Sequence, residues 1–132
     1  RMIAFGIPPE ERSLPEIRRI LLDQIEREQR RQSREDDVAF LCSAQLFAKG
    51  QPEDILLIWK AKRSGFDLGS MIDVQMLCGL GIEPTRKFLS GVGTVEATDA
   101  LNYLDRCVAA GDFEDWSPEN QIKIYRRYFG IE

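Results

Sequence analysis

Histidine is absent from the 132 residues of this sequence, which removes the commonest general base and metal ligand available at neutral pH. Cysteine is scarce, because only Cys42, Cys78 and Cys107 occur, widely spaced and without a Cys-x-x-Cys pair. This pattern argues against a disulfide framework and against a zinc knuckle. Catalysis would have to depend on carboxylates, lysines or an activated thiolate. We therefore expect a protein that is not an enzyme and that binds neither a metal nor a cofactor.

Long apolar runs are also missing from the chain. The longest strongly apolar run covers residues 55–59, far fewer than a membrane-spanning helix needs. Residues 2–9 are too few for a signal peptide and lack its flanking segments. The composition, 43% hydrophobic and 30% charged, is that of an ordinary globular protein. We expect a single domain in a bacterial cytoplasm, without contact with a membrane.

The sequence does contain a succession of helical patterns. After an S-x-x-E capping box that begins at Ser13, the residues Leu14, Ile17, Leu21 and Ile25 recur at helical spacing. Further helices are predicted over approximately residues 35–49, 52–63, 84–89 and 117–129, with one more from Asp67 or Ser70 to Cys78 and one from Val95 or Asp99 to Ala110. No turn dipeptide lies between two alternating apolar segments, so we predict no sheet.

A structural repeat accompanies these helices. Three times a helix that carries a cysteine ends at a glycine, and a proline then begins the next helix: Cys42/Gly50/Pro52, Cys78/Gly81/Pro84 and Cys107/Gly111/Pro118. This order is typical of stacked helical hairpins. We predict an all-α fold of six or seven helices in stacked antiparallel hairpins, similar to an α-solenoid. Residues 1–34 would form an N-terminal helix with a charged extension, and residues 35–132 the hairpin core.

Two glycine pairs, at residues 79–81 and 91–93, resemble the start of a phosphate-binding loop. Such a loop needs a strand before it, a helix after it, and a lysine or third glycine at a fixed offset. Here a helical pattern comes first, and neither residue follows at that offset, so we interpret both pairs as helix ends. Cys78 would lie near a helix C-terminus, where the helix dipole disfavours a thiolate. We interpret it, with Cys42 and Cys107, as a small core residue.

Asp73 lies between Ile72 and Val74 in the apolar stretch that we predict as a helix. A buried carboxylate needs a charged partner or a set of backbone donors. Two interpretations remain open. Asp73 either serves the fold as a cap or as the partner of an arginine, or it faces a groove and contacts a ligand or a protein partner.

Four arginines, Arg27, Arg30, Arg31 and Arg34, lie near one side of the first predicted helix. They alternate with glutamates and have no aromatic neighbours, and the chain as a whole has a net charge of −4. We interpret them as a solvated face with i,i+4 ion pairs and not as a nucleic-acid contact. Because residues 26–37 contain no apolar side chain, this stretch is either a solvated helical extension or a connection.

Acidic residues are concentrated in the C-terminal third. Residues 96–119 contain seven Asp or Glu and a single base, Arg106. Within them, residues 111–119 (GDFEDWSPE) combine two aromatic residues with four acids: Phe113 and Trp116, with Asp112, Glu114, Asp115 and Glu119. Either both rings fold inward as a plug while Ser117 caps the last helix, or they form an anchor within an acidic rim. The second arrangement would bind a basic protein.

The pattern ILLIWKAK…FDLGSMIDVQMLCGLGIEPTRKFL resembles the small all-helical immunity proteins of bacterial polymorphic-toxin and contact-competition loci. The resemblance covers about residues 36–115 and leaves out the first helix. It is carried by Ile72-Asp73, Gln75, Leu77-Cys78-Gly79, Gly81 and residues 85–89. Leu80 departs from the family, which has alanine between the two glycines. The resemblance implies a protein that binds a cognate toxin domain and blocks its active site without chemistry of its own.

From these observations we expect a non-catalytic, acidic binding domain, most simply an immunity protein that inhibits a toxin. The alternative is a helical adaptor or regulatory scaffold that recruits a partner without inhibiting it. The candidate partner-binding residues are those of the acidic segment together with Asp73.

Overall fold

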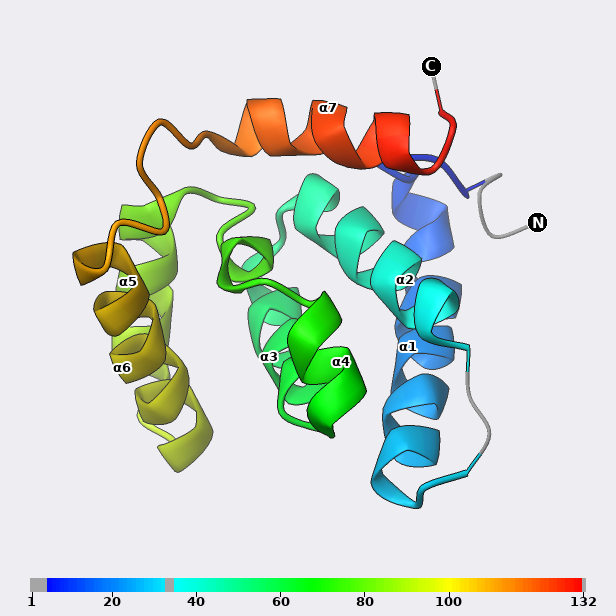
Figure 1. Ribbon diagram of the computed structural model, residues 1–132, viewed down its shortest axis with the longest axis horizontal. Coiled ribbons are helices and arrows are strands. Elements are labelled where there is room, and N and C mark those ends of the chain that lie inside the picture. The colour runs from blue at the N-terminus through cyan, green and yellow to red at the C-terminus, as the bar shows by residue number, and fades with distance from the viewer. Residues whose placement is uncertain (1–4, 33–34, 132) are drawn as a thin grey trace.

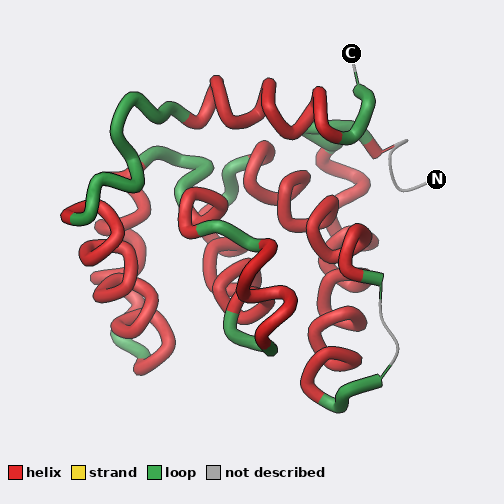
Figure 2. The backbone as a smooth tube through the Cα atoms, viewed as in Figure 1, coloured by secondary structure: helices red, strands yellow, loops and turns green. Residues whose placement is uncertain are grey.

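The computed structural model describes residues 5–32 and 35–131, and it shows no strand within these ranges. Figure 2 shows the chain as helices joined by short loops. The described residues form seven α-helices, α1 (Leu14–Gln29), α2 (Asp36–Lys49), α3 (Ile55–Lys62), α4 (Phe66–Met71), α5 (Ile82–Val92), α6 (Val95–Ala109) and α7 (Pro118–Tyr128). Short 3-10 turns occur at η2 (Glu11–Ser13), η3 (Pro52–Asp54) and η4 (Val74–Leu77). The predicted all-α fold is confirmed.

Consecutive helices pair as hairpins, but the pairs are displaced by one helix from the sequence repeat, which joined each cysteine-bearing helix to the helix after it. The pairs α1–α2, α3–α4 and α5–α6 lie side by side, and α7 packs across α2, away from the α5–α6 hairpin (Figure 1). The predicted cysteines Cys42 and Cys107 lie on the second helix of the first and third hairpins, and Cys78 follows η4. Gly50 ends α2 in the left-handed conformation, as the repeat required. The stacked-hairpin prediction is therefore confirmed.

The core lies mainly around α2. Residues 41–47 are all buried, because α1, α4 and α7 pack around this part of α2 and leave it no solvent-facing side. The predicted apolar stripe of α1 (Leu14, Ile17, Leu21 and Ile25) is also fully buried. Tyr125 of α7 packs edge-on against Phe47, with ring centroids 5.5 Å apart, and so attaches the crossing helix to the core.

The glycine pair at residues 79–81 is a packed elbow. A Cβ atom on Gly79 would lie 2.1 Å from the carbonyl oxygen of Phe47, so the turn touches the backbone of α2 directly. Gly81 has φ +98, a left-handed conformation that side chains disfavour, and it begins α5. In a phosphate loop the backbone faces the ligand, whereas here the backbone at Gly79 packs against α2.

Two details of the helix ends differ from the prediction. Ser13 has a helical conformation within η2 and accepts no capping hydrogen bond, so the predicted capping box is wrong. The single helix predicted from Asp67 or Ser70 to Cys78 is also wrong. It divides into α4 and η4, because Ile72 and Asp73 are extended and Ile72 inserts into the core. Lys62 stabilises this break by donating hydrogen bonds to the carbonyl oxygens of Gly69 and Ile72.

The charged stretch at residues 26–37 is divided between two structures. The end of α1 continues to Gln29, and α2 begins at Asp36. Arg27 pairs with Asp23 at 2.9 Å, as predicted for an i,i+4 ion pair, whereas Arg34 lies outside the described residues. Gln24 accepts a hydrogen bond from the backbone N–H of Glu35, which ties α1 to the beginning of α2.

Candidate functional site

The acidic loop, residues 111–119, comprises the connection from α6 to α7 and the first two residues of α7, at the outer edge of the third hairpin (Figure 1). Gly111 ends α6 with φ +91. The N–H of Asp112 bonds to the carbonyl oxygen of Cys107, and that of Gly111 to the carbonyl oxygen of Val108, the two bonds of a Schellman motif. Because both bonds satisfy helix-end carbonyls, the direction in which the loop leaves α6 is fixed.

The second half of the loop is held by a cap. The Ser117 side chain accepts a hydrogen bond from the N–H of Asn120, so the predicted cap of the last helix is confirmed. Asp115 has φ +56, a left-handed conformation that aspartate adopts more readily than most residues. The acidic loop is thus a defined turn and not a loose connection.

The two aromatic residues of the loop turn toward the protein. Phe113 is only 8% exposed, and Trp116 is half-buried against it in an edge-on pair with ring centroids 5.1 Å apart. The indole Nε1–H of Trp116 donates to Gln121 Oε1 at 3.0 Å. Of the two interpretations left open by the sequence, Phe113 has the geometry of the inward plug. Only Trp116 keeps part of its surface available to a partner.

The acids of the loop point to solvent. Asp112, Glu114, Asp115 and Glu119 are all exposed. They form no ion pair with any residue that the structure describes, and neither do Glu96 and Asp99 at the far end of α6. Asp105 differs, because Arg86 Nε lies 2.7 Å from its Oδ1. The sequence therefore located a surface of largely uncompensated negative charge.

Asp73 lies beside this surface. The Gln75 side chain donates to the backbone carbonyl of Asp112 at 2.9 Å, which attaches the start of η4 to the acidic loop. Asp73 is exposed, makes no capping hydrogen bond, and has Lys62 as its nearby opposite charge. The interpretation as a cap or as the partner of an arginine is therefore wrong. The structure instead brings Asp73 and the acidic loop together.

The charges around Asp73 act in opposite directions. Crowding by the surrounding protein raises the pKa of the Asp73 carboxyl, the Lys62 ammonium opposes that rise, and the negative charge of Asp112 adds to it. Burial lowers the pKa of Lys62, whose ammonium also lies 5.7 Å from the Tyr103 ring centroid. The sequence offered no signal for this lysine beyond the basic end of its helix.

The three thiols are not activated. Burial raises the pKa of Cys42 to about 12 and that of Cys78 to about 11. Burial also raises the pKa of Cys107, which is only half-buried. Cys42 and Cys78 are fully buried, as predicted for core residues. Cys107 packs at the edge of the core and not within it, so the prediction of a core residue is wrong for this cysteine.

The described part of the chain contains no group of three or more His, Cys, Asp or Glu side chains placed to hold a metal ion. Within the same residues, no helix is long and apolar enough to span a bilayer. Comparison of the chain with protein-family models, curated proteins and solved structures found no match. The functional argument therefore depends on the acidic loop and its surroundings.

Proposed function

We propose that this protein is a non-catalytic binding domain that uses the acidic loop to bind and block a basic toxin domain. The observation that carries the proposal is the set of exposed acids on the acidic loop, which form no ion pair with any described residue. A field of one sign speeds the encounter with a surface of the opposite sign. The resemblance to immunity proteins, which neutralise their cognate toxins, is in agreement with this role.

The fixed shape of the loop supports the same proposal. The Schellman motif, the Ser117 cap and the Trp116–Gln121 hydrogen bond each reduce the freedom of the segment before binding. A loop that is already ordered loses less conformational entropy when it binds. Carboxylates held in this way suit the cationic cleft of a toxin that acts on nucleic acid or nucleotides, since they can occupy the place of the substrate phosphates.

The experiment is co-expression with the protein encoded beside this one in its native genome, in a bacterial host, with growth as the readout. We expect the wild type to restore growth and Asp112→Lys/Glu114→Lys to fail. Asp115 is left unchanged because its left-handed backbone disfavours lysine. The matched control is Glu26→Lys/Asp37→Lys, which reverses two exposed acids elsewhere and should protect fully.

The same experiment separates inhibition from recruitment. If the two proteins bind each other while the partner remains fully active and toxic, the protein is an adaptor and not an inhibitor. If Asp112→Lys/Glu114→Lys is folded and protects as well as the wild type, the acidic loop is not the inhibitory surface.

A further inference from the structure

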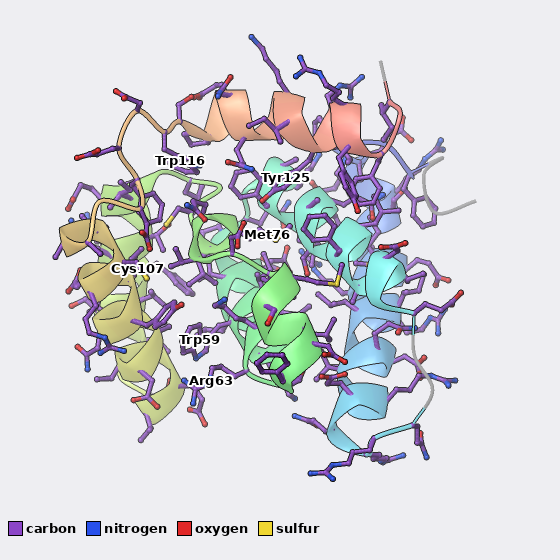
Figure 3. The ribbon with its side chains drawn as sticks, viewed as in Figure 1. Trp59, Arg63, Met76, Cys107, Trp116 and Tyr125 are labelled. Carbon is purple, nitrogen blue, oxygen red and sulfur yellow. The ribbon has the colours of Figure 1, made fainter. Side chains whose placement is uncertain are left out.

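A pocket of about 550 Å³ lies between α3 and the turn that joins α5 to α6, and Gln29 at the end of α1 also lines it. We name it the α3–α6 groove. Its apolar lining is formed by Leu56, Trp59 and Val92. Trp59 and Arg63 lie in the space between α3 and α6 (Figure 3). The volume is within the range of ordinary ligand sites, so the groove is large enough to receive a bulky side chain.

A large apolar side chain is exposed at one edge of the groove. Val95 is 73% exposed, a high value for a large hydrophobic residue. It lies between Thr94 and Glu96, which both line the groove. An apolar pocket bordered by an exposed apolar side chain is typical of a protein-binding surface.

The charge of this region is opposite to that of the acidic loop. Lys60 and Arg63 line the groove, are exposed, and form no ion pair with any described residue. Arg30 and Arg31 follow Gln29 and are likewise exposed and unpaired within the described residues. Glu96 is the single acid of the lining. The groove therefore suits a negatively charged ligand.

The aromatic lining favours an acidic protein segment over a nucleic acid as the anionic ligand. Trp59 is only 4% exposed, its ring lies 5.5 Å from the Tyr103 ring, and the Arg63 guanidinium lies 5.4 Å from its centroid. Nucleic-acid bases need an open aromatic face for stacking, and this ring offers none. A protein segment needs only an apolar surface for an anchoring side chain and cations for its carboxylates.

We propose that the α3–α6 groove binds an acidic segment of a partner protein, in which one large apolar side chain packs on Leu56 and Val92 and flanking carboxylates pair with Lys60 and Arg63. The groove lies at the other end of the third hairpin from the acidic loop, so this binding is independent of the function proposed above. The protein then has two surfaces of opposite charge and can hold two partners at once.

The test uses a synthetic peptide in which glutamates flank one leucine and one phenylalanine. The chain has two tryptophans, so Trp116→Phe leaves Trp59 as the single fluorescent reporter of the groove. We expect a saturable change in Trp59 fluorescence, and a loss of affinity of about tenfold or more in Lys60→Glu/Arg63→Glu. The matched control, Lys123→Glu/Arg127→Glu, makes the same charge change on exposed residues of α7 and should keep the wild-type affinity.

Four results would overturn the proposal. The first is that the peptide shows no saturable binding up to about 1 mM. The second is that both charge-reversed variants lose the same amount of peptide affinity, and the third is that a peptide with lysines in place of the glutamates binds equally well. The fourth is that the protein self-associates and Lys60→Glu/Arg63→Glu abolishes this self-association. The last would assign the groove to a second copy of the chain. If Lys60→Glu/Arg63→Glu does not fold, Val95→Asp places a negative charge on the exposed edge and should also weaken binding. Unchanged binding in that variant contradicts the proposal.

Discussion

The space available to a side chain differs greatly between positions in this protein, and Gly79 and Gly91 show the contrast. Gly79 packs against the Phe47 carbonyl with no room for a side chain, whereas a Cβ on Gly91 would meet nothing within 4 Å. Both glycines belong to pairs that look alike in the sequence. Their neighbours in space differ, and this could not be read from the sequence.

We predict opposite effects of alanine at these two positions. Gly79→Ala should destabilise the fold by about 2 kcal/mol or more, because the backbone of α2 would have to move. Gly91→Ala should stabilise it by about 0.5 kcal/mol, since alanine favours the interior of α5 over glycine. Urea unfolding of both variants measures the difference. Equal free energies of unfolding would contradict the close contact between Gly79 and Phe47.

Asp73 gives a pH-dependent prediction at the same scale. Its pKa is raised in the folded protein, chiefly by desolvation, so the folded state holds the proton more tightly than the unfolded state does. The wild type should therefore lose some stability as the pH rises through and above the usual aspartate pKa of about 3.9. Asp73→Asn cannot ionise and should lack this loss.

The measurement is the difference in melting temperature between Asp73→Asn and the wild type at acidic and at neutral pH. We expect this difference to shift in favour of Asp73→Asn as the pH rises. The effect should be small because Asp73 is exposed. A shift in the other direction would mean that the ionised carboxylate is stabilised, for example by a direct pair with Lys62.

At the scale of the helix, local patterns predicted the elements well where packing agrees with them. The stripe of α1, the end of α2 at Gly50 and the cap of α7 at Ser117 all follow from short-range rules. The break between α4 and η4 does not. It depends on the insertion of Ile72 into the core and on the hydrogen bonds from Lys62, which belongs to the preceding helix.

The sequence predicts both Ser13 and Ser117 as helix caps, but only Ser117 caps a helix in the structure, so the two serines should differ in their effect on stability. Ser117→Ala should destabilise the protein by about 1 kcal/mol, because it removes the acceptor for the N–H of Asn120. Ser13→Ala should change the stability by less than about 0.5 kcal/mol, since Ser13 makes no capping hydrogen bond. Thermal unfolding of both variants tests the difference. A large loss for Ser13→Ala would show that the capping box forms after all.

For the whole molecule, the sequence revealed the charge of the surface more readily than its shape. The acids of residues 96–119 are contiguous enough to be counted directly. The fold then adds Asp73 to them and turns Phe113 inward, which no periodicity could show. The α3–α6 groove was missed because its lining comes from three separate parts of the chain. Its one sequence signal was the basic end of α3.

The most direct test of the proposed function is the rate of association with the protein encoded by the adjacent gene, measured at low and high salt. If the acidic loop steers a basic partner, the wild-type rate should fall steeply with salt. At low salt, Asp112→Lys/Glu114→Lys should associate about tenfold or more slowly and with little salt dependence, while Glu26→Lys/Asp37→Lys should behave like the wild type. Association of all three proteins at the same rate, with the same salt dependence, would contradict a role of the acidic loop in binding.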